Sequence, residues 1–208
     1  MYNIILVLVL AICYATDINN ELLDILYEDQ DWILDDTLDD GSLIHIKMID
    51  NISLKAVKIS RDIKINPTIV MNIIKDIKNY NSILKSSSNL ITTPIAFGND
   101  IIAKQYISIP IFSDLYYFFK IYESNKKVYW LLQNQDDYNQ HQTYGYPLSI
   151  GCGGWDYVEH DDGTHTINYR LIFDIDGYPN WAINYINYYS LLNVYNDVIN
   201  YALNNDFK

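Results

Sequence analysis

Alternating hydrophobic and polar positions predict a series of β-strands through the middle of the chain. Strands are expected at Leu43–Ile49, Leu54–Ser60, Leu90–Phe97, Ile101–Ile109, Leu115–Tyr122, Val128–Gln133, Tyr157–His160 and Thr164–Asp174. Several neighbouring strands are separated by Gly, Asn and Asp residues, which favour the tight turns of hairpins. The pattern therefore predicts an antiparallel sheet.

Helical spacing of apolar residues appears on both sides of this run of strands. A helix is predicted over the first part of Ile18–Leu34, and a second over Pro67–Asn79, where a proline stands just inside the start. A long terminal helix is predicted from Pro179 to about Leu203. The polar stretch Asn134–Tyr146 is expected to be a long loop. An antiparallel sheet with a long helix against it is an α+β arrangement, and the space between them suits an apolar ligand.

The first fifteen residues form a separate apolar segment. Met1–Ala15 contains no charged side chain, and its apolar stretch ends shortly before the small residues Cys13 and Ala15. These features predict a secretory signal peptide that is cleaved after Ala15, which would place the protein in the secretory pathway or outside the cell. The alternative is a buried first element of the fold. With no linker or repeat, residues 16–208 are expected to form one domain.

The negative net charge of the chain limits the classes of molecule that it is expected to bind. Fourteen Lys and Arg residues against 26 Asp and Glu residues give a net charge of -12, and no basic run interrupts the acidic chain. Nucleic acid is therefore not an expected partner, because its binding requires clustered positive charge. A steady hold on an anionic membrane is also disfavoured. We expect a monomer.

Candidate chemistry is sparse. His160 and His165 flank an Asp-Asp-Gly turn and would supply two ligands of a metal site, but solvated turn residues are the favoured interpretation. Cys152 is interpreted as a small buried residue. Gly151–Gly154 around it is interpreted as a strand bend where the backbone passes close to a neighbour, and not as a phosphate loop. We therefore predict no catalytic residue, no metal and no cofactor.

Residues spread over most of the chain carry a family resemblance. They are Trp32, Asp40-Gly41, Asp76–Tyr80, Gly153-Gly154-Trp155, Thr164–Tyr169, Asp174, Gly177, Pro179, Trp181 and Asn184. In this order and spacing, the region from Trp32 to Leu203 resembles the START lipid-transfer domains. The resemblance implies a helix-grip fold, in which a curved antiparallel sheet wraps around the long C-terminal helix and encloses a hydrophobic cavity. It further implies one bound lipid or sterol and transient contact with membranes.

Two positions depart from the family pattern. Ser113 stands where the family usually has an arginine, so any buried Arg–carboxylate pair is expected to be absent. Ile83 stands where a tryptophan is usual.

The terminal helix supplies most of the candidate ligand-binding residues. Tyr185, Tyr188, Leu192, Tyr195 and Ile199 recur at spacings of three and four and are expected to line the cavity, together with Tyr189 and Trp155. Ordinary core packing is the alternative, and it is the more frequent cause of such spacing on a helix. The predicted function is a START-like lipid carrier without enzymatic activity. A helix-grip enzyme of the cyclase type and a secreted protein-interaction domain remain the alternatives.

Overall fold

The computed structural model describes residues 18–49, 54–86, 90–96, 101–108, 113–141, 144–148 and 150–205. The predicted leader Met1–Ala15 lies outside the described residues, as do the turns at Asp50-Asn51 and Gly98-Asn99-Asp100.

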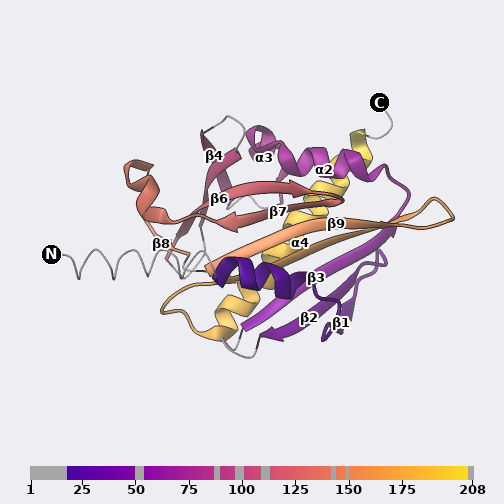
Figure 1. Cartoon of the computed structure of the whole chain (residues 1–208), viewed down its shortest axis with the longest axis horizontal. Helices are drawn as coiled ribbons and strands as arrows, with labels where there is room; N and C mark the ends of the chain where they lie inside the picture. The colour runs from indigo at the N-terminus through magenta and orange to yellow at the C-terminus, as the bar shows by residue number, and fades with distance from the viewer. Residues whose placement is uncertain are drawn as a thin grey trace.

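One large sheet forms the body of the molecule (Figure 1). Its strands are β1 (Ile33–Thr37), β2 (Leu43–Ile49), β3 (Leu54–Ile63), β4 (Leu90–Ala96), β5 (Ile101–Ile107), β6 (Leu115–Ser124), β7 (Lys127–Leu132), β8 (Tyr146–Pro147), β9 (Ile150–Glu159) and β10 (His165–Asp174). They pair in the order β1-β2-β3-β10-β9-β7-β6-β5-β4, and the short β8 adds a parallel pair to β6. Every other pairing is antiparallel, as the hairpin signals predicted.

Helices lie on both faces of the sheet. Residues 18–27 are helical, and the labelled helical elements are α2 (Pro67–Lys75), η1 (Ile77–Asn79), α3 (Tyr80–Ile83), η2 (Gln135–His141) and α4 (Asn180–Asn205). Figure 1 shows α4 crossing one face of the sheet with α2 and α3 beside its C-terminal half, while the N-terminal helix covers the other face. The α+β helix-grip architecture is thus confirmed.

Three side chains fix the rotation of α4 against the sheet. The buried Asn187 side chain accepts from the backbone N–H of Phe173 at 3.2 Å and donates to its carbonyl at 3.1 Å. Asn184 accepts from the N–H of Lys55 at 3.2 Å, and the Tyr195 hydroxyl donates to the carbonyl of Ile167 at 3.0 Å. Since buried polar groups need such partners, these bonds dictate which side of the helix faces the strands.

Alternation along β9 and β10 divides their residues between the two faces. Tyr169 faces α4, whereas its neighbour Arg170 places its guanidinium 4.9 Å from the centre of the Tyr27 ring, under the N-terminal helix. Arg170 forms an ion pair with Asp156, which also accepts from the Asn168 amide at 2.7 Å. A buried Arg–carboxylate pair therefore exists, contrary to our expectation, but on the sheet face away from α4.

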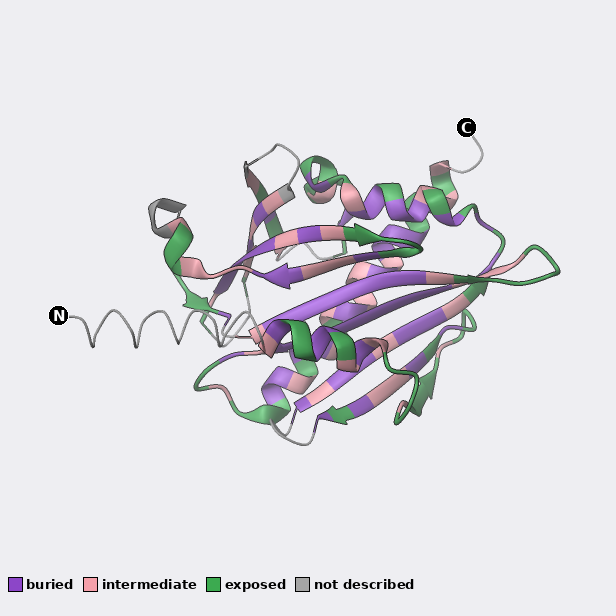
Figure 2. Cartoon of the chain, in the orientation of Figure 1, coloured by how far each residue is buried: buried purple, intermediate pink, exposed green. Residues whose placement is uncertain are grey.

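Glycine at position 154 lets the N-terminal helix approach the sheet. A Cβ there would collide with the Tyr27 hydroxyl and would lie 2.9 Å from the Tyr129 Cβ. Figure 2 colours most of β9 as buried. The predicted close approach of a neighbour at the glycine-rich segment is thus confirmed, but the segment is regular strand within β9 and not a bend.

We predict that Gly154→Ala destabilises the fold by about 1–3 kcal/mol, the usual cost of overpacking. Urea unfolding, monitored by circular dichroism, measures this loss of unfolding free energy. Adding Tyr27→Phe should recover part of the loss, because it removes the colliding oxygen, a buried hydroxyl with no hydrogen-bond partner among the described residues. A double variant as unstable as Gly154→Ala alone would contradict this account.

The structure differs from the predicted elements in three places. Ile33–Thr37 forms the edge strand β1, where no strand was predicted. All five residues are exposed, so no alternation of buried and exposed positions marks this strand. β9 starts at Ile150, seven residues before the predicted Tyr157. The predicted loop Asn134–Tyr146 contains η2, and its last residue begins β8.

Candidate functional site

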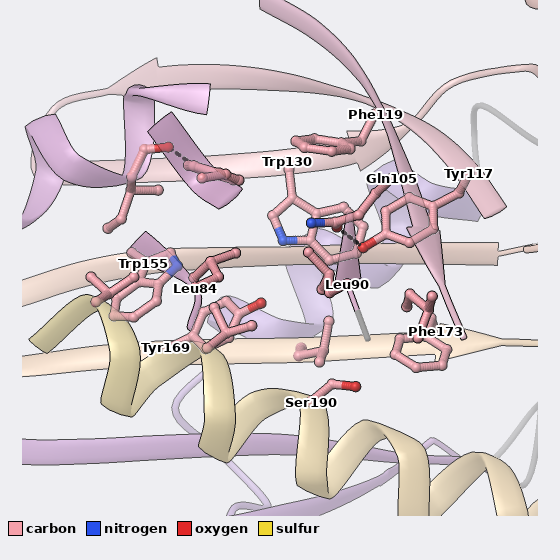
Figure 3. A pocket seen from close by; sticks show the side chains of 16 residues that line it. Leu84, Leu90, Gln105, Tyr117, Phe119, Trp130, Trp155, Tyr169, Phe173 and Ser190 are labelled. Atoms are coloured by element: carbon pink, nitrogen blue, oxygen red, sulfur yellow. Dashed lines mark hydrogen bonds between the residues drawn. The ribbon is translucent and has the colours of Figure 1, made fainter. Parts of the chain in front are cut away.

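A cavity lies between the sheet and α4, on the face that also carries α2 and α3 (Figure 3). Its volume is about 60 Å³. Strands β4, β5, β6, β7, β9 and β10 form its floor, and α4 contributes Ser190, Val194 and Val198. The walls therefore come from segments that are far apart in the sequence and that meet only through the pairing of the strands.

Aromatic rings make up much of the wall. The Trp130 ring lies 6.0 Å from Tyr117 and 6.2 Å from Phe119, measured between ring centres. Trp155 stacks on Tyr169 at 4.3 Å. Such rings provide a large apolar surface with few rotatable bonds, which suits a site for a hydrophobic molecule.

The polar atoms on the wall are largely occupied by the protein. The Tyr117 hydroxyl donates to the side-chain carbonyl of Gln105, whose amide donates to the Thr92 hydroxyl at 3.0 Å. The Tyr80 hydroxyl donates to the backbone carbonyl of Ile74. Ser190, by contrast, makes no side-chain hydrogen bond to any residue that the structure describes.

Burial suppresses acid–base chemistry on the wall. It raises the pKa of Tyr80, Tyr117 and Tyr169 well above the ordinary value, because the charged phenolate is poorly solvated there. The other lining residues are aliphatic, aromatic, amide or hydroxyl side chains. The described wall is thus electrically neutral at physiological pH.

The exposed part of the lining marks the mouth of the cavity. Leu90 on the edge strand β4 and Ile107 on the neighbouring β5 are half-buried, and so are Ser190 and Val194 on α4. Most of the other wall residues are buried, while Tyr80 and Trp130 are half-buried. The mouth therefore lies between the β4–β5 edge of the sheet and α4.

The observed volume is small for a lipid. Pockets that hold drug-sized molecules measure roughly 300–1,000 Å³, whereas this cavity measures about 60 Å³. A lipid or sterol thus fits only if the walls move apart. The mouth is the place where this costs least, since a central strand is held by ladders on both sides and an edge strand by one.

Two of the predicted lining residues stack inside the fold. Trp155 lines the cavity. Tyr195 is fully buried and stacks on Trp155 at 5.5 Å, but its hydroxyl is already bonded to the carbonyl of Ile167. Tyr195 therefore packs behind the cavity wall, and its hydroxyl proton is already donated within the protein.

The other predicted residues lie away from this cavity. Tyr185, Tyr188 and Tyr189 line a separate depression on the outside, Leu192 is half-buried in the core, and Ile199 is buried there. The expected face of α4 is thus corrected. The cavity-lining Ser190 and Val194 stand two residues after Tyr188 and Leu192, which places them about 200° further around the helix.

The structure does not assemble a metal site from the two turn histidines. His160 lies 2.6 Å from the Thr166 hydroxyl oxygen, while His165 lies against Tyr157 across the hairpin. Among the described residues, no group of three or more His, Cys, Asp or Glu side chains is arranged to hold a metal ion. Cys152 is fully buried, as predicted, and burial raises the pKa of its thiol.

None of the described helices combines the length and the apolar character needed to cross a bilayer.

Sequence comparison finds no relative: no protein-family model matches the chain, and no curated protein matches it significantly. The fold, however, is similar to solved structures. Human StAR-related lipid transfer protein 5 superposes with a TM-score of 0.66 at 8% identity, covering 94% of this chain and 97% of that chain. A STAR-related lipid transfer protein fragment from Xanthomonas axonopodis gives 0.63 at 12% identity, over 81% and 97%.

An enzyme has a similar but less extensive match. The Zhui aromatase/cyclase from a Streptomyces species superposes with a TM-score of 0.52 at 9% identity, over 71% of this chain and 92% of that chain. The TM-scores and the covered share of this chain are higher for the lipid-transfer proteins. This chain has the helix-grip fold of the StAR-related lipid transfer domains.

Proposed function

We propose that this protein is a lipid carrier that holds one lipid or sterol in the cavity between its sheet and α4. The observation that carries the proposal is the character of the wall: aromatic and aliphatic, neutral, and with most of its polar atoms already hydrogen-bonded within the protein. A molecule that is largely hydrocarbon gains from such surroundings, while a charged metabolite loses its hydration without compensation.

Uptake requires the cavity to expand. Leu90 and Ile107 on one side and Val194 on the other would separate as α4 and the β4–β5 edge move apart. One bond that must adjust is that from the N–H of Ser86 to the Asp197 carboxylate, 2.8 Å long, which ties the segment after α3 to α4. The hydroxyl of Ser190, which has no hydrogen-bond partner among the described residues, would then meet the polar end of the ligand near the mouth.

The cyclase alternative has less support on the wall itself. Ring-closing enzymes of this kind need groups that exchange protons near neutral pH. The described lining contains no His, Cys, Asp, Glu, Lys or Arg, and its tyrosines are held neutral by burial. Action outside the cytosol rests on the leader Met1–Ala15 and stays a prediction.

Native mass spectrometry tests the carrier function. Purified protein is incubated with vesicles that contain a mixture of phospholipids and a sterol, separated from them, and sprayed under non-denaturing conditions. We expect one lipid mass per protein chain, recovered unchanged on extraction. Protein that emerges without bound lipid at every lipid composition would overturn the proposal, and a chemically altered ligand would favour the enzyme.

A further inference from the structure

A second depression lies outside the cavity, where the first half of α4 passes the β1–β2–β3 edge of the sheet. Its volume is about 260 Å³. Val57 and Ile46 contribute apolar surface, and four aromatic side chains of α4 form one wall: Trp181, Tyr185, Tyr188 and Tyr189.

The aromatic wall is exposed to an unusual degree. Trp181 is 68% exposed, Tyr185 58% and Tyr189 46%. The ring centres of Tyr185 and Tyr189 are 4.2 Å apart with an angle of 44° between the planes, and those of Tyr188 and Tyr189 are 5.7 Å apart at 70°. Tyr189 thus packs against both other tyrosines, and these side chains still leave aromatic surface exposed, which attracts an organic cation.

Acidic side chains stand at the same depression. Asp35 lines it, and a register shift in β1 between Leu34 and Asp36 accommodates Asp35 as an extra residue. Bulges of this kind redirect side chains at sheet edges. Partial burial raises the pKa of Tyr188, and the carboxylates of Asp36 and Asp35 raise it further, so both carboxylates act on this tyrosine.

One basic side chain completes the set. Lys55 of β3 lines the depression, and among the described residues its ammonium group has no ion pair with Asp35 or any other carboxylate. Aromatic faces and a carboxylate suit a methylated ammonium group, while the lysine suits a phosphate.

We propose that this depression binds the phosphocholine group, with the trimethylammonium end against the tyrosines and Asp35 and the phosphate towards Lys55. The group has two sources, a free phosphocholine solute or the head of a choline phospholipid in a membrane surface. The site is separate from the lipid cavity, so it does not depend on the carrier function.

Titration of the full-length protein with phosphocholine, followed by calorimetry, tests the site. We expect binding that Tyr185→Leu weakens at least tenfold, since leucine retains apolar bulk but removes the π-face. Asp35→Asn should weaken it about fivefold. Tyr201→Leu is the matched control: it lies on the same helix, 36% exposed, at about 24 Å from Tyr185 for a rise of 1.5 Å per residue, and should bind as the wild type does.

Two further comparisons separate charge from shape. Dimethylbutanol, the uncharged carbon isostere of choline, should bind at least tenfold more weakly than choline. Lys55→Gln should reduce phosphocholine binding to the level of choline while leaving choline binding unchanged. Equal binding of choline and its isostere would overturn the cation site, and so would a phosphocholine affinity that is insensitive to Tyr185→Leu.

Vesicle sedimentation distinguishes the two sources. Binding to phosphatidylcholine vesicles that is lost in Tyr185→Leu identifies the lipid head, whereas binding of free phosphocholine alone identifies the solute; absence of both overturns the proposal. Val194→Trp, which fills the internal cavity, should keep phosphocholine binding. If Val194→Trp loses phosphocholine binding and Tyr185→Leu keeps it, the ligand lies in the cavity instead.

Discussion

Replacing Val194 by tryptophan should abolish lipid binding while the protein stays folded. Val194 points from α4 into a cavity of about 60 Å³, and it is half-buried, so the large ring occupies the space that a ligand needs without entering the tightly packed core. Lipid bound per chain, measured by native mass spectrometry after incubation with vesicles, should fall at least tenfold.

Tyr185→Trp is the matched control on the same helix. Tyr185 lies on the outer depression and is 58% exposed, so this variant should carry as much lipid as the wild type. Far-ultraviolet circular dichroism confirms that both variants are folded. If Val194→Trp binds lipid normally, the cavity is ordinary core space, and the carrier function loses its structural basis.

Removing one partner of the buried Arg170–Asp156 ion pair should cost about 3–5 kcal/mol of unfolding free energy, because the remaining charge stays buried without compensation. In Asp156→Ala the Arg170 guanidinium loses its carboxylate, and the Asn168 amide loses its acceptor. Both partners are less than a tenth exposed, so water cannot replace what is lost. Urea unfolding at neutral pH measures the change.

Two other variants make this prediction specific. Arg170→Met with Asp156→Leu removes both charges and should be close to the wild type in stability, or above it. Glu159 lies on the same strand as Asp156 and forms an exposed ion pair with Lys126, in which nitrogen and oxygen are 3.1 Å apart. Glu159→Ala breaks this pair and should lower the unfolding free energy by no more than about 1 kcal/mol. An Asp156→Ala protein as stable as Glu159→Ala would show that the buried pair contributes little.

The sequence predicted most strands because one face of each is buried. Leu43–Ile49 was predicted with the bounds it has, since its alternation follows the pleat. At Gly151–Gly154 the sequence predicts both a bend and the close approach of a neighbour that glycine allows. Only the close approach is present: the strand is regular there, and a Cβ at Gly153 would lie 2.7 Å from the Trp130 indole nitrogen.

The candidate site was harder to predict than the fold. The alternation of apolar and polar residues indicates a strand, but it does not reveal which residues pair between strands. Gln105 and Tyr117, for example, lie opposite each other on β5 and β6. On α4, large tyrosines gave the stronger apolar stripe, so they were assigned to the interior. Buried asparagines set the rotation instead: Asn187 occupies the sheet face because its amide caps the backbone of Phe173. The short side chains of Ser190 and Val194 leave the space that larger residues would fill.

The β1 bulge has a consequence for self-association. A sheet that does not close into a barrel leaves two edges whose backbone groups are able to pair with another copy of the chain. At one edge, β1 is five residues long, irregular at Asp35, and bears adjacent carboxylates; at the other, β4 carries Pro94 next to a second register shift. Short strands, bulges, charge and proline are the features that natural sheets use against edge-to-edge aggregation. The irregularity that shapes the outer depression thus also keeps one end of the sheet from growing into a neighbour.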